Sequence, residues 1–267
     1  MCKVTLTCFC VSSSHSSLEH LASSPAYRFL FGLEHLNIIC GNLNDYRLEF
    51  LSFIYSGYDT DVITDYVLEK EYFFKQLKTL IQDCNIRILF SFDINGGINA
   101  ELDPIPGFTF TQRFLQLCKA ICASIDITIN TIPVISDRGK THSGVYYYVY
   151  SDTELNIAEL NSASGSMPTR TLKKGEIITV EPSEDYSWNI EMDFDKEMPC
   201  KPMKAIMNAI LKPKELGTYC IDRGLNSHMD LTLYGIYESV VRFTIDFAFV
   251  CFCVDLRIGR LEIDIMG

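Results

Sequence analysis

Residues 64–92 read TDYVLEKEYFFKQLKTLIQDCNIRILFSF and contain both kinds of regular structure in immediate succession. Apolar residues recur at helical spacing from Thr64 to about Asp83, and charged residues lie largely on the opposite side, which predicts an amphipathic helix. The apolar run from Ile86 to Phe92 is typical of a buried strand. A helix that leads directly into a buried strand indicates a protein of mixed α and β structure.

The first half of the chain repeats this alternation. Period-two alternation predicts a strand from Lys3 to Val11, and a further strand is expected from Asp126 to Ile135. The patterns Ser16-x-x-Glu19 and Thr109-x-x-Gln112 match capping boxes, so a helix is expected to open at each. The first half is therefore expected to form a helix-bearing mixed sheet.

Strand patterns dominate the second half, and one short helix, residues 202–211, interrupts them. The expected strands are Val145–Tyr150, Glu176–Val180, Tyr186–Phe194, Met229–Ile236, Val240–Val254 and Arg257–Ile265. The predicted fold class is α+β, with mainly antiparallel β structure in this half. We expect a single globular unit whose α/β-type half, residues 1–135, joins a β-rich half, residues 144–267, through a polar loop, residues 136–143. No internal repeat is visible in the sequence.

Composition narrows the classes of partner. The 267-residue chain is 48% hydrophobic and carries a formal net charge of −11. Its lysines and arginines are scattered, whereas binding to a nucleic-acid backbone or to an anionic membrane requires them in clusters. We therefore expect no nucleic-acid and no membrane partner, and a protein with a basic surface is the favoured partner.

The cysteines and the most apolar segment indicate the compartment. The chain has 11 cysteines, an odd number, with no C-x-x-C spacing, so free thiols in a reducing cytosol are expected. Residues 243–256 are strongly apolar, but Asp246 and Asp255 interrupt them and the segment is too short to cross a bilayer. The prediction is a soluble, cytoplasmic protein.

Motifs for catalysis or for cofactor and metal binding are incomplete. Gly139-Lys140-Thr141 lacks the preceding glycine of a phosphate-binding loop, because Val134 stands at that position. The acidic stretch that begins at Asp93 has Ile98 and Pro104 where a calcium loop needs glycine and glutamate. No histidine lies in a recognisable hydrolase signature. We therefore expect no catalytic residue, no cofactor and no metal.

Two segments are candidate protein-binding surfaces. A strand from Val145 to Tyr150 places three tyrosines on one face, and tyrosine is favoured at interfaces; the alternative is an ordinary half-buried strand. A strand from Tyr186 to Asp195 places Trp188 and Ile190 on the core face and acids on the other; the alternative is a solvated face. The candidate residues are Tyr146, Tyr148, Tyr150, Glu184, Asp185, Glu191, Asp193 and Asp195.

The abundance of Phe, Tyr, Cys, Ile, Leu and Asn resembles the amino-acid usage of accessory proteins of large RNA viruses with U-rich genomes. This resemblance is compositional and covers no motif. The leading hypothesis is a non-enzymatic intracellular interaction protein, a viral accessory protein that antagonises a host regulatory complex in innate immune signalling, stress response or translation initiation. The alternatives are a viral structural protein, matrix or capsid-like, and an enzyme whose site is assembled from residues distant in sequence.

Overall fold

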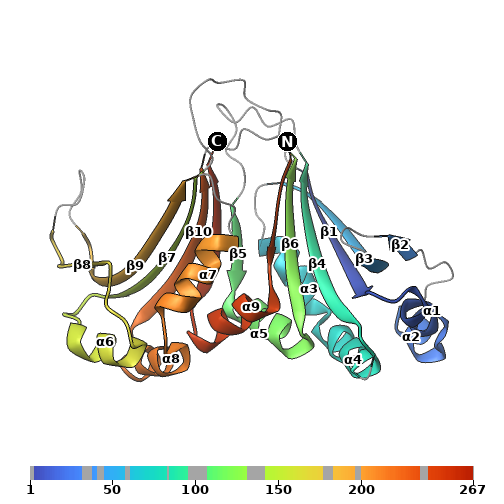
Figure 1. Cartoon of the computed structure of the whole chain (residues 1–267), viewed down its shortest axis with the longest axis horizontal. Coiled ribbons are helices and arrows are strands. Elements are labelled where there is room, and N and C mark those ends of the chain that lie inside the picture. The colour runs from blue at the N-terminus through green and yellow to red at the C-terminus, as the bar shows by residue number, and fades with distance from the viewer. Residues whose placement is uncertain are drawn as a thin grey trace. The chain divides into compact units, whose positions relative to one another are not determined.

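The computed structural model of the chain forms two compact units, and neither is a continuous stretch of sequence. Unit 1 comprises residues 1–99, 116–132 and 238–247, and unit 2 comprises residues 100–115, 133–237 and 248–267. The residues that the structure describes are 3–31, 38–40, 45–57, 61–82, 84–95, 107–130, 142–176, 183–195, 200–234 and 240–266. Helices and mixed sheets occur in both units, which confirms the predicted α+β class (Figure 1).

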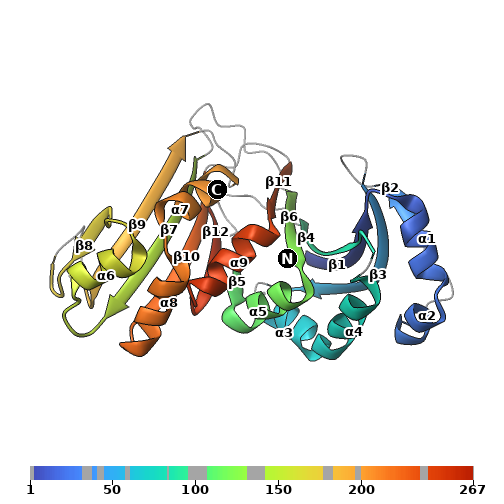
Figure 2. The same cartoon turned by 60° about the horizontal axis from the view of Figure 1, so that its bottom comes forward.

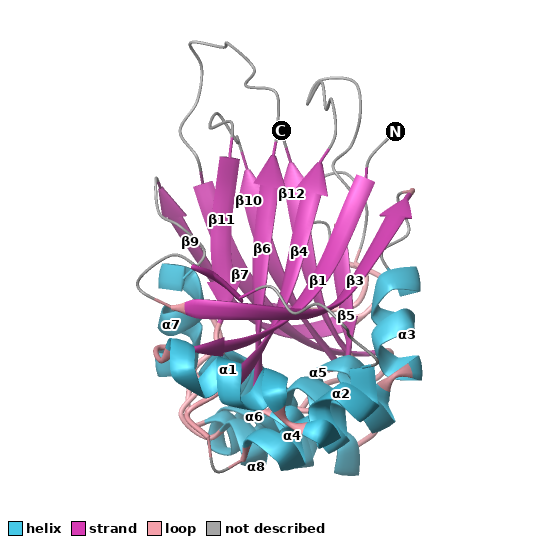
Figure 3. Ribbon diagram, turned by 90° about the vertical axis from the view of Figure 1, so that its right-hand side faces the viewer, coloured by secondary structure: helices cyan, strands magenta, loops and turns pink. Residues whose placement is uncertain are grey.

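Unit 1 is built on a six-stranded sheet of order β11-β6-β4-β1-β3-β2, in which β4 and β6 are parallel and the other neighbours antiparallel. Figure 3 shows β11, β6, β4, β1 and β3 side by side in this order. Its described elements are β1 (Lys3–Ser12), α1 (His15–Ser23), α2 (Pro25–Phe31), β2 (Ile38–Cys40), β3 (Tyr46–Ser56), α3 (Asp61–Glu69), α4 (Glu71–Ile81), β4 (Arg87–Asn95), most of α5 (Gln112–Ile121), β6 (Ala123–Asn130) and β11 (Val240–Ile245).

The core of unit 1 lies between one face of this sheet and its helices. Leu6 in β1 and Phe92 in β4 are fully buried on that face, as strict alternation requires. Phe74 of α4 packs between Phe50 of β3 and Phe90 of β4, with ring centroids 6.0 and 5.2 Å apart. Figure 2 shows α3 and α4 along this side of the sheet. Among the described residues, no helix of unit 1 covers the opposite face (Figure 2).

Unit 2 is built on a second six-stranded sheet, of order β5-β12-β10-β7-β9-β8, in which β10 and β12 are parallel. Trp188 of β9 is fully buried on its helix-covered face, where its Nε1 donates a hydrogen bond to Asn161 Oδ1 of α6. The described elements are β5 (Phe108–Thr111), β7 (His142–Ser151), α6 (Ile157–Ser164), β8 (Arg170–Leu172), β9 (Tyr186–Asp195), α7 (Cys200–Ala209), α8 (Pro213–Asp222), β10 (Asn226–Tyr234), α9 (Phe247–Asp255) and β12 (Arg260–Met266).

The two sheets repeat one topology, although no repeat is visible in the sequence. Strands β1, β2, β3, β4 and β6 occupy the positions in the first sheet that β7, β8, β9, β10 and β12 occupy in the second. The strand ends match as well: Ser12 Oγ accepts a hydrogen bond from the Ser14 amide, and Ser151 Oγ accepts one from the Thr153 amide, each at 3.1 Å. The repeat therefore lies in the arrangement of the backbone and not in a visible sequence pattern.

The edge strands of the repeat are exchanged along the chain. β5 lies between β4 and β6 in sequence, yet it pairs with β12 in unit 2. β11 lies between β10 and β12, yet it pairs with β6 in unit 1. A division of the chain at residues 136–143 does not include this exchange, because each unit takes one edge strand from the other half of the sequence.

Two expectations about local structure were wrong. Residues 240–254 form β11 followed by helix α9, in which Phe249, Val250, Phe252 and Cys253 are buried at helical spacing. An apolar run of this length does not distinguish a buried helix from a strand, so burial decided the outcome. The second half was expected to contain one short helix, but α6 and α8 are helices as well.

The helix starts also differ from the capping boxes. α1 begins at His15, because the Ser14 side chain accepts a hydrogen bond from the Ser17 amide. α5 begins at Gln112, where Thr111 Oγ1 accepts a hydrogen bond from the Phe114 amide at 3.3 Å. The predicted helix from Thr64 to Asp83 is divided into α3 and α4 at Lys70. Residues 136–141 and 96–104, which include the loop with Gly139-Lys140-Thr141 and most of the calcium-like stretch, lie outside the described residues.

Candidate functional site

The three predicted tyrosines lie on the face of the unit 2 sheet opposite its helices. Val145, Tyr147 and Val149 of β7 are fully buried in the core, so Tyr146, Tyr148 and Tyr150 point the other way and are half-buried. The rings of Tyr146 and Tyr148 are stacked with centroids 6.3 Å apart. This arrangement is a continuous aromatic surface along one strand.

The predicted acidic strand lies directly beside the tyrosines. β9 pairs with β7 so that Glu191 is opposite Tyr146 and Asp193 is opposite Gly144. The Tyr146 hydroxyl donates a hydrogen bond to Asp193 Oδ1. Trp188 and Ile190 are buried on the core face, as predicted. Two surface features that the sequence presents separately are therefore one surface in the structure.

The other predicted acids lie at the ends of β9 and not beside the tyrosines. Glu184 and Asp185 lie in the bend that precedes β9; Glu184 is exposed and Asp185 is half-buried. The backbone of Asp195 pairs with that of His142 at the end of the strand, and its side chain lies outside the described set. Glu191 and Asp193 are thus the predicted acids that the structure joins to the tyrosines.

Two further strands extend this surface with residues that no sequence pattern distinguishes. In β10, His228 is opposite Tyr148 and Asp230 is opposite Tyr146. The His228 ring lies 4.8 Å from the Tyr148 ring and 5.3 Å from the Tyr150 ring. In β12, Glu262 is in register with Asp230, and Asp264 follows on the same face. We call this surface the tyrosine–acid face: Tyr146, Tyr148, Tyr150, Glu191, Asp193, His228, Asp230, Glu262 and Asp264.

The acids of the tyrosine–acid face are crowded. Burial, the largest cause, raises the pKa of both Glu262 and Asp264. The charge of Asp230 adds to the rise in both, and Arg260 opposes it. His228 Nε2 lies 3.6 Å from Asp230 Oδ2. A cation that approached this face would relieve the repulsion among these carboxylates.

Several polar atoms on the same sheet face are buried and have no hydrogen-bond partner among the described residues. They are Ser187 Oγ, Asn189 Oδ1, His228 Nδ1 and Asp230 Oδ1. Ser187 and Asn189 flank Tyr150 and Tyr148 in the register of β9. Buried polar atoms are nearly always paired in folded proteins, and an unpaired one costs about 1–3 kcal/mol. These four atoms are therefore polar groups that a bound partner or solvent can satisfy.

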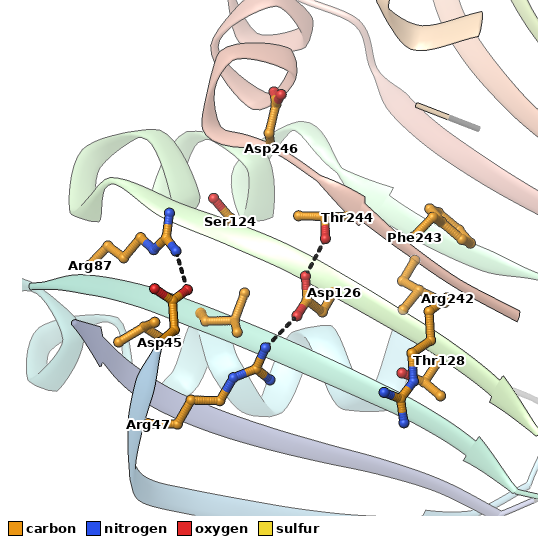
Figure 4. A pocket seen from close by; sticks show the side chains of 13 residues that line it. Asp45, Arg47, Arg87, Ser124, Asp126, Thr128, Arg242, Phe243, Thr244 and Asp246 are labelled. Atoms are coloured by element: carbon orange, nitrogen blue, oxygen red, sulfur yellow. Dashed lines mark hydrogen bonds and ion pairs between the residues drawn. The ribbon is translucent and has the colours of Figure 1, made fainter. Parts of the chain in front are cut away.

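A second surface feature is a groove on the face of the unit 1 sheet opposite its described helices, shown in Figure 4. Its cavity volume is about 350 Å³. Arg47, Arg87, Arg242, Asp45, Asp126, Asp246, Ser124, Thr128, Thr244, Val11 and Leu89 are among its lining residues. No sequence pattern distinguishes these residues as a group, because they come from strands that are distant in the chain.

Ion pairs organise the groove. The Arg47 Nη2 atom lies 3.4 Å from Asp126 Oδ2, and the Thr244 hydroxyl donates to Asp126 Oδ1 at 2.6 Å. Arg87 Nη2 lies 2.6 Å from Asp45 Oδ2. Figure 4 shows these three interactions and places Arg242 beside Thr128, away from Asp126.

Comparisons with known proteins leave the family open. No protein-family model matches the chain, and no curated protein has a significantly similar sequence. A crystal structure of an unknown protein from Galdieria sulphuraria is similar over 86% of this chain and 98% of that one, with 11% identity and a TM-score of 0.18. A TM-score this low carries no argument about fold or function.

Three further findings on the described residues concern metal binding, membrane-spanning helices and the state of the cysteines. Within them, no group of three or more His, Cys, Asp or Glu side chains is placed to hold a metal ion. No helix among them is long and apolar enough to cross a bilayer. Free thiols among them include Cys8, Cys10, Cys84, Cys118, Cys122, Cys220 and Cys253.

Proposed function

We propose that the protein is a non-enzymatic interaction protein that binds a partner protein through the tyrosine–acid face. The observation that carries the proposal is the register of β9, β7 and β10, which places Tyr146 between Glu191 and Asp230. Aromatic rings and carboxylates in alternation form a surface that suits lysine or arginine side chains.

Arginine fits this surface best for two reasons. Its guanidinium group stacks on aromatic rings, and Tyr148 and His228 form a ring pair at its centre. Its five N–H groups are donors only, and Asn189 Oδ1 and Asp230 Oδ1 are acceptors without a partner among the described residues. Small rotations of the covering rings would be needed to open these buried atoms to the partner.

A charge-reversal experiment tests the proposal. The test variant is Glu191→Lys with Asp193→Lys, and the matched control is Glu215→Lys with Asp222→Lys, two exposed acids of helix α8. Both variants change the net charge equally. Association of a fluorescein-labelled oligoarginine peptide is measured by stopped-flow at several salt concentrations. The test variant should slow association about tenfold at low salt and flatten its salt dependence, while the control changes it by less than about twofold.

The aromatic part of the face is tested separately. Tyr148→Leu removes the ring and should weaken peptide binding about two- to fivefold, whereas Tyr148→Phe keeps the ring and should bind as the wild type does. Equal slowing by both charge variants, together with no effect of Tyr148→Leu, would mean that only the net charge attracts the peptide. The viral origin, the virion-component alternative and the enzyme alternative stay predictions from the sequence.

A further inference from the structure

The groove of unit 1 contains arginines that the fold itself does not require, as a comparison with the matching strands of unit 2 shows. Arg47 and Arg87 flank Val11, the residue before the turn-forming Ser12. The equivalent position in unit 2 is Tyr150, before Ser151, and its neighbours are Ser187 and Asn226. The same sheet therefore forms with uncharged residues at both positions.

Other groove residues do recur in the repeat. Asp126 is paired with Thr244 across β6 and β11, and Glu262 is paired with Thr109 across β12 and β5. An acid beside a threonine at this edge is common to both units, so it belongs to the shared architecture. The arginines are the addition that distinguishes unit 1.

These arginines have unused hydrogen-bond donors. Arg47 makes one long ion-pair contact, at 3.4 Å, and its buried Nε has no acceptor among the described residues. Arg242 is exposed, and the described part of the chain places no carboxylate within 4.0 Å of its guanidinium group. Burial raises the pKa of Asp93, and the charges of Arg242 and Arg47 oppose this rise.

The floor and the charge of the groove restrict what could bind. Phe9, Val11 and Leu89 form a small, largely buried apolar cluster on this sheet face, and the cavity reaches Val11 and Leu89. Burial of a ligand's apolar body against these two side chains would be favourable. Three arginines and three aspartates line the groove, so no net field attracts a polyanion. A volume of about 350 Å³ is at the small end of ordinary ligand pockets.

We infer that the groove binds a small organic carboxylate, with its anionic group on Arg47 and Arg242 and its apolar body on Val11 and Leu89. A carboxylate accepts two N–H bonds from a guanidinium group in a fixed geometry, which a groove without net charge can exploit. This site lies in unit 1 and is independent of the tyrosine–acid face.

The inference is tested by ligand-observed NMR titration of the full chain at constant ionic strength. The probes are benzoate, acetate and phenyl phosphate. Benzoate should bind more tightly than acetate, because acetate lacks the apolar body, and phenyl phosphate should gain nothing from its extra charge. Arg242→Gln, at an exposed position, should weaken benzoate about tenfold or more, as expected for a hydrogen bond to a charged group. Arg170→Gln, an exposed arginine of β8, is the matched control and should leave the affinity unchanged.

Arg47→Gln should also weaken benzoate binding, and its thermal melt shows whether the variant is folded. If it unfolds, the comparison of Arg242→Gln with Arg170→Gln decides the question. Equal affinities for acetate and benzoate, equal weakening by the two surface variants, or no binding of benzoate would each overturn the inference.

Discussion

Replacing Trp188 by phenylalanine tests the packing that supports the tyrosine–acid face. Trp188 is fully buried, and its Nε1 donates to Asn161 Oδ1 at 2.9 Å, joining β9 to helix α6. Its ring also lies against Tyr147, with centroids 6.3 Å apart. The substitution removes the hydrogen bond and leaves a gap where the second ring of the indole was.

The magnitude follows from these two losses. The hydrogen bond contributes about 1 kcal/mol, because Asn161 is half-buried and water can replace part of it. Truncating a buried Trp or Phe to Ala costs about 3–5 kcal/mol, and the smaller change to Phe should cost roughly 1–2 kcal/mol. We therefore expect Trp188→Phe to lower the free energy of unfolding by about 2–3 kcal/mol.

A double-mutant cycle separates the two losses. Urea unfolding is followed by far-ultraviolet circular dichroism for the wild type, Trp188→Phe, Asn161→Ala and the double variant. The coupling energy between the two sites should be about 1 kcal/mol, the contribution of the hydrogen bond. A coupling energy near zero would show that this hydrogen bond adds nothing to stability. A loss below about 0.5 kcal/mol for Trp188→Phe would refute the packing argument as well.

Four further outcomes are expected. The pKa values of Glu262 and Asp264 are raised in the folded state, so their ionisation lowers the free energy of unfolding at neutral pH, and this loss is recovered as pH falls. Asp264→Asn should therefore raise the melting temperature at pH 7 and give no such increase in acid. Titration of thiols in denaturant should find close to 11 reactive groups, whereas native Cys8 and Cys253 should react slowly because burial raises their pKa; four or more paired cysteines would contradict this. Thermal melts with and without a strong chelator should coincide, and a lower melting temperature with the chelator would show that a metal site was missed. A fragment of residues 1–135 lacks β11, so it should expose the edge of β6 and aggregate; a monomeric, cooperatively folded fragment would refute a structural role for the exchanged strand.

Local pattern was sufficient for the features that depend on neighbours in sequence. The alternation in Tyr186–Asp195 predicted which side chains of β9 are buried, and Trp188 and Ile190 lie in the core as expected. The tyrosines of β7 were placed on one face for the same reason, since side chains alternate along any strand. The α+β class followed from the succession of such segments.

Tertiary structure decided everything that depends on which segments meet. Strand pairing is non-local, so no pattern within β7 could indicate that Glu191 lies opposite Tyr146, or that His228 lies opposite Tyr148. The groove of unit 1 assembles from β1, β3, β4, β6 and β11 for the same reason. Burial likewise made residues 247–255 a helix although their composition favours a strand. The alternation within each strand determined the face on which its side chains lie. Long-range pairing, including the exchange of β5 and β11, determined which faces became sites, because hydrogen bonds between strands join residues that no local periodicity relates.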